Sequence, residues 1–281
     1  MNSMKKGKSP GPDGLSVEFY RQFWDLLEDQ IFNMFQDCIK SGEMVSTMKQ
    51  GLISLIPKPD KDPSLIDNWR PITLLNIDYK LIALVYAKRL KKGIDTIINE
   101  TQTGFMKGRR ISSNIRLVLD LIDYSDAIDS DALVLFLDFC KAFDTIEYEF
   151  LFRSLNLFGF GENVIKVIRM FYKDINSSVL LNFNTSKRFN INRSVRQGCP
   201  ISPFLFILVV ELLFLDIRND ANLYGLTIFN KEIKISQLAD DTTLFLRDKD
   251  QVAHALNAIT AFSTASGLKL NVSKCEILCL F

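Results

Sequence analysis

Histidine is almost missing from this chain of 281 residues, since His254 is the only one. Catalysis by a Ser–His or Cys–His pair is therefore disfavoured, because no other sequence feature marks His254 as a base. The five cysteines lie far apart except for Cys275 and Cys279, and no histidine flanks that pair, which argues against a zinc site. We interpret the cysteines as free thiols in a protein of a reducing compartment.

Long hydrophobic runs are missing as well. The longest one, 203–215, is interrupted by Glu211 and is shorter than the roughly 17 residues that a membrane-spanning helix needs. The first residues are polar and basic with no apolar segment after them, so we expect no secretory signal. These absences predict an intracellular protein, nuclear or cytoplasmic or both, that is not secreted and has no membrane partner.

An excess of positive charge is also missing: the formal net charge is +1, whereas nucleic-acid-binding domains are usually more basic. The basic residues are gathered in clusters instead. Any one cluster is typical of a solvated face, but four of them leave open a basic groove on a nearly neutral protein. The clusters are Lys5, Lys6 and Lys8; Lys88, Arg89, Lys91 and Lys92; Lys107, Arg109 and Arg110; and Lys187, Arg188, Arg193 and Arg196.

Two adjacent acids, Asp240 and Asp241, stand between apolar segments in the stretch 236–246. The pattern predicts a hairpin of two half-buried strands with both carboxylates at its tip. Acids beside buried strands are costly unless a cation compensates them. An isolated Asp-Asp pair is more typical of a surface turn, so this stretch alone leaves both interpretations open.

A third acid changes that balance. The apolar run 133–137 ends in Asp138 and predicts a fully buried strand that delivers one carboxylate at its carboxyl end. Three carboxylates brought side by side would repel one another, and two divalent cations would neutralise them. Oxygen ligands suit Mg²⁺, and a pair of such ions is the arrangement used in two-metal phosphoryl transfer.

The remaining pattern predicts an α+β fold in which helices surround a mostly antiparallel sheet. We expect polar or basic loops over 58–71 and 101–110. We expect helices over 17–39 (two short ones or one bent one), 74–92, 113–123, 146–157, 162–171, 204–215 and 251–265. We expect strands over 52–56 and 133–137, two or three strands within 178–195, the hairpin around the acid pair, and a final strand that starts at 268–270.

Seven short motifs follow one another along nearly the whole chain: KSPGPDG at 8–14, IPKP at 56–59 with NWRPI at 68–72, QTGFMKGR at 102–109, DFCKAFD at 138–144, RQGCPISP at 196–203, ADD at 239–241 and GLKLNVSK at 267–274. In this order they resemble the motifs of reverse transcriptases of non-LTR retrotransposons, the long interspersed elements of animals. The resemblance implies a right-hand polymerase fold with fingers at about 1–130 plus part of 145–195, and a palm with an antiparallel sheet at about 131–145 and 196–281. The thumb is expected to be absent, as are the endonuclease, the RNase H region and the Cys/His knuckle of longer relatives.

The resemblance also implies an activity and its cofactor. Asp138, Asp240 and Asp241 would hold two Mg²⁺ ions, with the backbone carbonyl of Phe139 as a further ligand. The expected partners are an RNA template, a DNA primer and deoxynucleotides; protein partners stay unknown. The primer 3′-hydroxyl would attack the α-phosphate of the nucleotide, and pyrophosphate would leave. Leu238 departs from the Phe or Tyr that many relatives carry before Ala-Asp-Asp.

Several residues acquire substrate roles only through this resemblance. Phe143 would block a 2′-hydroxyl, although it could also be an ordinary buried aromatic residue. Lys58 and Arg70 would bind the triphosphate, unless they belong to a solvated loop. Lys274 would protonate pyrophosphate or be a surface lysine.

The turn at Gln197 and Gly198 would lie beside the incoming nucleotide, and Arg109 and Arg110 would contact template phosphates. Two alternatives stay open: a catalytically inactive, truncated remnant that at most binds RNA, and an RNA polymerase on the same palm, against which Phe143 argues.

Overall fold

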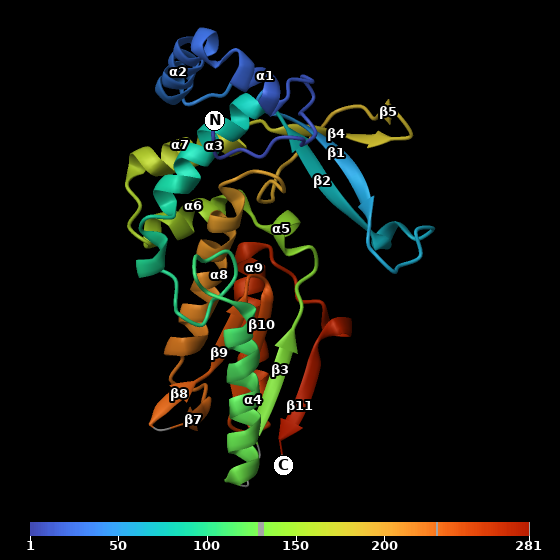
Figure 1. Cartoon of the computed structure of the whole chain (residues 1–281). Coiled ribbons are helices and arrows are strands. Elements are labelled where there is room, and N and C mark those ends of the chain that lie inside the picture. Colours follow the sequence, from blue (N-terminus) through green and yellow to red (C-terminus); the bar gives the residue numbers. More distant parts are fainter. Residues whose placement is uncertain (129–131, 229, 281) are drawn as a thin grey trace. The chain divides into compact units, whose positions relative to one another are not determined.

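The computed structural model describes residues 1–128, 132–228 and 230–280. The chain forms two compact units and enters each of them twice: Met1–Leu90 with Leu155–Ser202 makes the first, and Lys91–Ser154 with Pro203–Phe281 makes the second. Figure 1 shows their elements coloured along the sequence. The limits predicted above for fingers and palm stay a prediction.

The first unit opens with two helices, α1 (Val17–Gln22) and α2 (Trp24–Ser41), as the helical spacing predicted. The Ser16 hydroxyl caps α1 by accepting a hydrogen bond from the Phe19 N–H. Helix α2 ends at Gly42, whose φ of 68° lies in the left-handed region that favours glycine. Val17 and Tyr20 pack with residues of α3 (Ile77–Leu90) in a small core. The other helix that lies wholly in this unit is α7 (Glu162–Tyr172), and α6 (Tyr148–Leu157) passes from the second unit into the first.

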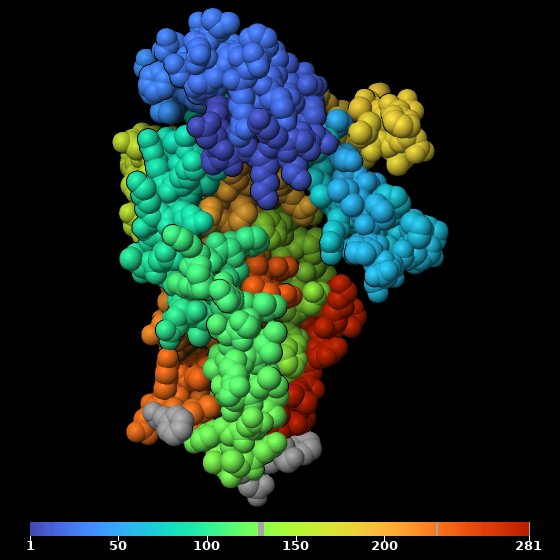
Figure 2. Space-filling view, in the orientation of Figure 1, coloured from blue at the N-terminus to red at the C-terminus, as the bar shows by residue number. Residues whose placement is uncertain are grey.

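The sheet of the first unit contains a strand that the sequence did not predict. Its order is β2-β1-β4-β5, with β6 (Phe189–Asn190) also on β4, and it includes β1 (Gln50–Pro57), β4 (Asn176–Leu181) and β5 (Asn184–Thr185). Strand β2 (Trp69–Leu75) runs antiparallel to β1, so the expected loop to 71 and helix from 74 were wrong there. Pro71 is tolerated because β2 is an edge strand. Strands β1 and β4 pair in parallel, which is an exception to the predicted antiparallel pattern. Figure 2 shows the tip of the β1–β2 hairpin projecting from its own unit.

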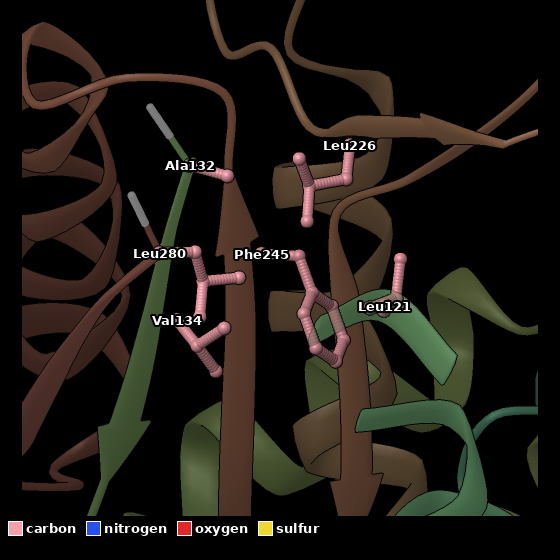
Figure 3. Close-up of a cluster of buried hydrophobic side chains, with 6 residues drawn as sticks. All are labelled: Leu121, Ala132, Val134, Leu226, Phe245 and Leu280. Carbon is pink, nitrogen blue, oxygen red and sulfur yellow. The ribbon is translucent and has the colours of Figure 1, made fainter. Parts of the chain in front are cut away.

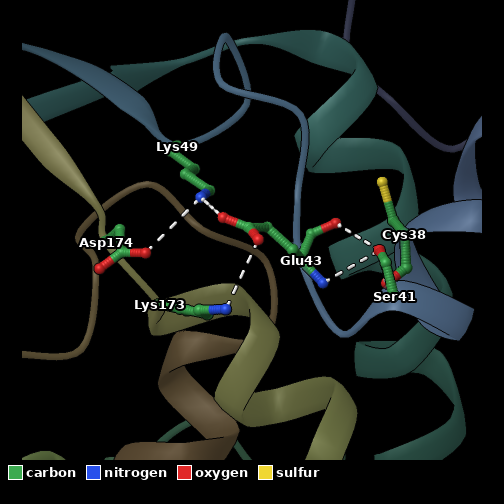
Figure 4. Close-up of polar contacts among 6 residues, drawn as sticks. All are labelled: Cys38, Ser41, Glu43, Lys49, Lys173 and Asp174. Atoms are coloured by element: carbon green, nitrogen blue, oxygen red, sulfur yellow. Dashed lines mark hydrogen bonds and ion pairs between the residues drawn. The ribbon is translucent and has the colours of Figure 1, made fainter.

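Charged side chains join the segments that lead into β1 and β4. Lys49, with a mostly buried side chain, pairs with Glu43 and, at 3.7 Å, with Asp174; Lys173 lies 3.5 Å from the same Glu43 (Figure 4). The neighbouring cations lower the pKa of the Glu43 carboxyl, and the Lys49 hydrogen bond is the largest cause. The network therefore ties together the starts of two strands that are distant in sequence.

The sheet of the second unit has the order β11-β3-β10-β9, and each pair is antiparallel. Its strands are β3 (Ala132–Leu137), β9 (Ile235–Leu238), β10 (Asp241–Leu246) and β11 (Glu276–Leu280). The buried strand and the hairpin are confirmed. The final strand expected at 268–270 was wrong: Leu270 makes only an isolated bridge to Phe139, and β11 begins after η3 (Val272–Lys274).

Helices α4 (Ile111–Ala127), α8 (Ser202–Asn219) and α9 (Asp250–Ser266) complete this unit, with the short α5 (Ala142–Thr145). One face of the sheet carries a cluster of buried side chains, drawn in Figure 3: Leu121, Ala132, Val134, Leu226, Phe245 and Leu280. A small hairpin, β7 (Leu226–Ile228) and β8 (Lys231–Ile233), was not predicted. None of the helices in the described ranges combines enough length and hydropathy to cross a bilayer.

One acid is buried inside α8, in the part 204–215 that the sequence predicted as an all-round apolar helix. The side chain of Glu211 is 1% exposed and accepts a hydrogen bond from the Asn99 N–H at 3.0 Å. Burial raises the pKa of this carboxyl from 4.5 to about 7. Its ionised form is therefore costly in the folded state.

Replacing Glu211 by Gln should stabilise the protein at pH 8 and change little at pH 5. The folded state keeps its proton up to about pH 7 and the unfolded state loses it near 4.5, so the free energy of unfolding of the parent falls between those values. The variant lacks this loss, so its free energy of unfolding at pH 8 should exceed that of the parent by about 3 kcal/mol. Urea unfolding of parent and variant at both pH values measures this difference. A difference in stability that is the same at pH 5 and pH 8 would contradict the raised pKa of Glu211.

Candidate active site

The pairing of β3 with β10 brings the three predicted acids to one end of the second unit's sheet. Leu137 is opposite Thr242, so the next position along each strand sets Asp138 opposite Asp241. Asp240 lies in the tight turn between β9 and β10, because Leu238 pairs with Asp241 across it. Directly opposed residues of an antiparallel pair have Cα atoms about 5 Å apart. The strands therefore deliver carboxylates from distant parts of the chain to one edge.

The acids interact electrostatically. Burial raises the pKa of Asp240, and the charges of Asp241 and Asp138 raise it further. Desolvation likewise raises the pKa of Asp241, with Asp138 as the second cause. Neighbouring negative charges that raise the pKa values of Asp240 and Asp241 favour a bound cation, because a cation stabilises the ionised carboxylates.

Asp138 is held by the segment that follows α9. The Asn271 N–H donates to the Asp138 carbonyl at 2.8 Å, and the Asn271 side-chain amide donates to the Asp138 carboxylate, also at 2.8 Å. The Ser273 hydroxyl donates to Asn271 Oδ1 at 2.9 Å and so helps to fix that amide. Lys274 Nζ lies 3.8 Å from Asp138 Oδ2, with its side chain 67% exposed. Lys274 therefore lies beside the acids, where its role toward pyrophosphate stays a prediction.

The donor chemistry of these residues fits magnesium, but their side chains are not gathered as ligands. Among the described residues, no group of three or more His, Cys, Asp or Glu side chains stands ready to hold a metal ion. At Asp138, the Asn271 amide donates to Oδ2, and Lys274 Nζ lies 3.8 Å from the same atom. Oxygen donors at the meeting strand ends remain the ligand type that Mg²⁺ prefers. Two backbone hydrogen bonds flank Phe139: the Asn271 N–H donates to the Asp138 carbonyl, and the Cys140 N–H donates to the Lys269 carbonyl. The Phe139 carbonyl takes part in neither of them.

Phe143 lies on α5, five positions after Asp138, and is held between aromatic rings. Its ring stacks on Phe206 with centroids 4.3 Å apart and an interplanar angle of 8°, and it meets Phe105 edge to face at 6.0 Å. Offset stacking of this kind stabilises one ring orientation. The half-buried ring is thus fixed in place, as a residue that excludes a hydroxyl by size would need to be.

Lys58 and Arg70 lie on the hairpin of the first unit. Arg70 pairs with Ile56 in the β1–β2 register and is exposed. Lys58 follows two positions after Ile56, donates its backbone N–H to Asn68 and donates Nζ to the Asp67 carbonyl at 2.7 Å. Both cations are carried by one hairpin, and their triphosphate role stays a prediction.

Gln197 and Gly198 lie in the loop before α8, against β2 within the first unit. Gly198 has a φ of +86°, and a Cβ placed there would come within 2.6 Å of the Thr73 carbonyl oxygen. Arg196, which the sequence grouped with a solvated basic face, is buried instead: its guanidinium lies over the Tyr79 ring at 4.8 Å and donates to the Lys49 carbonyl. The loop is therefore anchored next to the strand that carries Arg70.

Replacing Gly198 by Ala should destabilise the first unit by about 1–3 kcal/mol, because it adds both a clash and a strained φ. The Michaelis constant for nucleotide should rise as the loop moves off Thr73. Gly159→Ala is the matched control, since its φ of +77° is similar but nothing lies within 4 Å of the added Cβ. Thermal unfolding and nucleotide titration measure both effects. Equal effects of the two substitutions would show that the contact with Thr73 does not matter.

Arg109 and Arg110 lie before α4 and differ in what surrounds them. The Arg109 guanidinium donates to the carbonyls of Ile98, Asn99 and Gln102, so it holds its own loop together. Arg110 is exposed and precedes the first residue of α4. Their contact with template phosphates stays a prediction, and Arg110 is the one whose side chain is open to solvent.

Two amide side chains that contact the acid-bearing segments, Gln102 and Asn271, were not predicted from the sequence. Both lie inside motifs that were recognised. Asn271 had a visible signal, because it is a polar residue between Leu270 and Val272 in a segment expected to be a strand. Gln102 had none beyond its place in the motif, since its partners lie far along the chain.

Residues 56–279 match the model of a protein family described as reverse transcriptase (RNA-dependent DNA polymerase). Among curated proteins, the chain is 32% identical over 273 residues to a 149 kDa protein of transposon TX1 from Xenopus laevis, covering 96% of the chain and 21% of that protein. It is 29% identical over 274 residues to a Pol polyprotein of retrotransposable element R2 from Popillia japonica, covering 96% of the chain and 37% of that relative. The chain thus spans well under half the length of these relatives.

Solved structures of telomerase are similar in fold. A telomerase from Candida tropicalis, solved with a TWJ fragment of telomeric RNA, matches with a TM-score of 0.58 and 14% identity, over 92% of this chain and 45% of that one. A telomerase from Candida albicans matches with a TM-score of 0.56 and 12% identity, over 94% of this chain and 46% of that one. At such identities the likeness concerns the fold alone, and it confirms the predicted α+β, right-hand polymerase architecture.

Proposed function

Because the chain belongs to the reverse transcriptase family, with non-LTR retrotransposon proteins among its relatives, we propose that it catalyses RNA-directed DNA synthesis. The observation that carries the proposal is the register of β3 on β10, which sets Asp138 opposite the Asp240–Asp241 turn. The partners would be an RNA template, a DNA primer and deoxynucleotides. The two-metal arrangement predicted from the sequence is part of this proposal.

Asp138, Asp240 and Asp241 would hold two Mg²⁺ ions, with the Phe139 carbonyl as a further ligand. When bound, these ions would supply positive charge to the attacking 3′-hydroxyl and to the leaving phosphate oxygen. A metal ion at Oδ2 of Asp138 would compete with the contacts that this atom makes with Asn271 and Lys274. Lys274, which lies beside the acids, would act on pyrophosphate, as predicted from the motif.

The other residues position the substrate. Phe143, fixed by its stack on Phe206, would exclude the 2′-hydroxyl of a ribonucleotide. Lys58 and Arg70 would bind the triphosphate, with Arg70 offering a forked donor and Lys58 a point charge. Gln197 and Gly198 would line the nucleotide through backbone that approaches closely. Arg110, and Arg109 if its loop opens, would contact template phosphates, which orient the strand without reading its sequence.

Primer extension on an RNA template, with Mg²⁺ and deoxynucleotides, tests the proposal. The expected result is a DNA product complementary to the template. Extension that requires ribonucleotides would favour an RNA polymerase. RNA binding without any extension would favour the alternative of an inactive remnant that at most binds RNA.

A further inference from the structure

The turn that carries the acid pair contains a strained residue. Ala239, directly before Asp240, has a φ of +57°, in the left-handed region that an L-residue with a Cβ enters at a cost of about 1–2 kcal/mol. Ala239 is also buried. A turn of this kind persists only when its surroundings hold it there.

Gln102 binds both the backbone N–H and the backbone carbonyl of that residue. Its Oε1 atom accepts from the Ala239 N–H at 2.9 Å, and its Nε2 atom donates to the Ala239 carbonyl at 3.3 Å. The same Oε1 accepts from the Gly104 N–H at 2.8 Å, and Nε2 lies 3.4 Å from Gln237 Oε1. The orientation of the amide follows from these contacts, because two backbone N–H groups can only donate and must face the oxygen. Gln102 is 0% exposed, so water does not replace these bonds.

The backbone around Gln102 reinforces the contact. Gln102 and Gln237 form a parallel bridge in which the Gln237 N–H donates to the Thr101 carbonyl and the Thr103 N–H donates to the Gln237 carbonyl. A Cβ on Gly104 would lie 2.3 Å from the Ala239 nitrogen, so only glycine allows this approach. The segment 101–104 therefore packs directly against the turn at Ala239 and Asp240.

We propose that Gln102 is a positioning residue of the polymerase site, which acts by locking the left-handed turn at Ala239 and so fixing where Asp240 and Asp241 point. The inference rests on the proposed function for its catalytic consequence, and on geometry alone for the lock. If Gln102 had only a structural role, its amide would satisfy its own hydrogen bonds without setting the orientation of Asp240 and Asp241. The two roles predict different behaviour of the turn when the amide is removed: a positioning role predicts that the turn loosens, and a structural role predicts that it does not.

Three variants of the full chain separate these views. Gln102→Ala removes the lock. Gln102→Glu keeps the oxygen that accepts from Ala239 and Gly104, and its carboxyl group, kept neutral by burial, offers a hydroxyl in place of the amide donor to the Ala239 carbonyl. Gln251→Ala is the matched control, because Gln251 is a buried glutamine of the same unit whose Oε1 accepts from the Tyr224 N–H, away from the acids.

Amide hydrogen exchange of the full chain is the first readout, and it needs no activity. Gln102→Ala should speed exchange in the segments 103–105 and 238–241, Gln102→Glu should do so less, and Gln251→Ala should change only the region of Tyr224. Equal exchange at the turn in the parent and Gln102→Ala would overturn the proposal. If exchange rises throughout the chain in Gln102→Ala, then Gln102→Glu decides. Faster exchange of Gln102→Glu confined to 103–105 and 238–241 would support the lock, and unchanged exchange there would overturn it.

Steady-state primer extension is the second readout. We expect kcat to fall on the order of 10²-fold in Gln102→Ala, because misplaced catalytic groups cost about that much, with little change in the Michaelis constant for nucleotide. Gln102→Glu should recover part of the loss and Gln251→Ala should match the parent. An equal fall in Gln251→Ala would overturn the positioning role. A parent that extends no primer would contradict the proposed function, while the exchange result would still decide on the lock.

Discussion

Asp240→Asn should greatly slow primer extension while making the protein more stable. The amide keeps the shape of the side chain but not its charge, so we expect the rate to fall on the order of 10³-fold, as when a group that stabilises transition-state charge is removed. Stability should rise because burial and the nearby charges of Asp241 and Asp138 raise the pKa of the Asp240 carboxyl, so its ionised form is unfavourable at pH 7. Extension assays and thermal unfolding at pH 7 measure the two effects.

The control for this variant is Asp120→Asn. Asp120 is a partly exposed acid of α4 that pairs with Arg116, so its loss should change neither activity nor melting temperature appreciably. Loss of activity in Asp240→Asn accompanied by a lower melting temperature would point to damage of the fold instead. Unchanged activity would remove Asp240 from the catalytic set.

Phe143→Ala should let the protein accept ribonucleotides. The ring is fixed by Phe206 and Phe105, and its removal opens space where the 2′-hydroxyl would lie. Discrimination by exclusion of one small group is worth about 10- to 200-fold, so the preference for deoxynucleotides should fall on the order of 10²-fold. Competing kcat/KM values for one deoxynucleotide and its ribonucleotide measure the change.

Phe143→Tyr and Phe105→Ala complete that experiment. The tyrosine keeps the ring and should keep the preference. Phe105→Ala removes only the edge-to-face contact at 6.0 Å and keeps the stack on Phe206, so it should lower the preference much less than Phe143→Ala does. An unchanged preference in Phe143→Ala would refute the assignment of Phe143 as the group that excludes the hydroxyl.

Local sequence patterns predicted those parts of the fold in which a single segment shows a buried apolar face by itself. The run 133–137, the hairpin around Asp240 and the apolar helix α8 were all confirmed, because each buries a continuous or alternating apolar face. Gly267 likewise marked the end of α9. For the same reason, the meeting of Asp138 with the acid pair could be inferred before the register was known.

Pairings between distant segments could not be predicted in this way. Strand β2 was missed because Pro71 and the polar residues before it resemble a loop, and only its partner β1 makes it a strand. The parallel pairing of β1 with β4 leaves no local mark. The contacts of Gln102 are of the same kind, because a glutamine in a loop shows nothing of the turn it binds 137 positions later.

The central place of β3 has a consequence for how the protein acquires its structure. Both neighbours of β3 in the sheet, β10 and β11, follow it by more than a hundred positions, because the pairs join Leu135 to Leu244 and Ile277. During synthesis, β3 therefore emerges with both of its edges unpaired. Unpaired strands of this kind are prone to associate with other chains, and contacts between distant segments form slowly. Nascent chains that stall before β11 should accordingly require chaperone binding to stay unaggregated, and the yield of soluble protein should depend on the time between the synthesis of these strands.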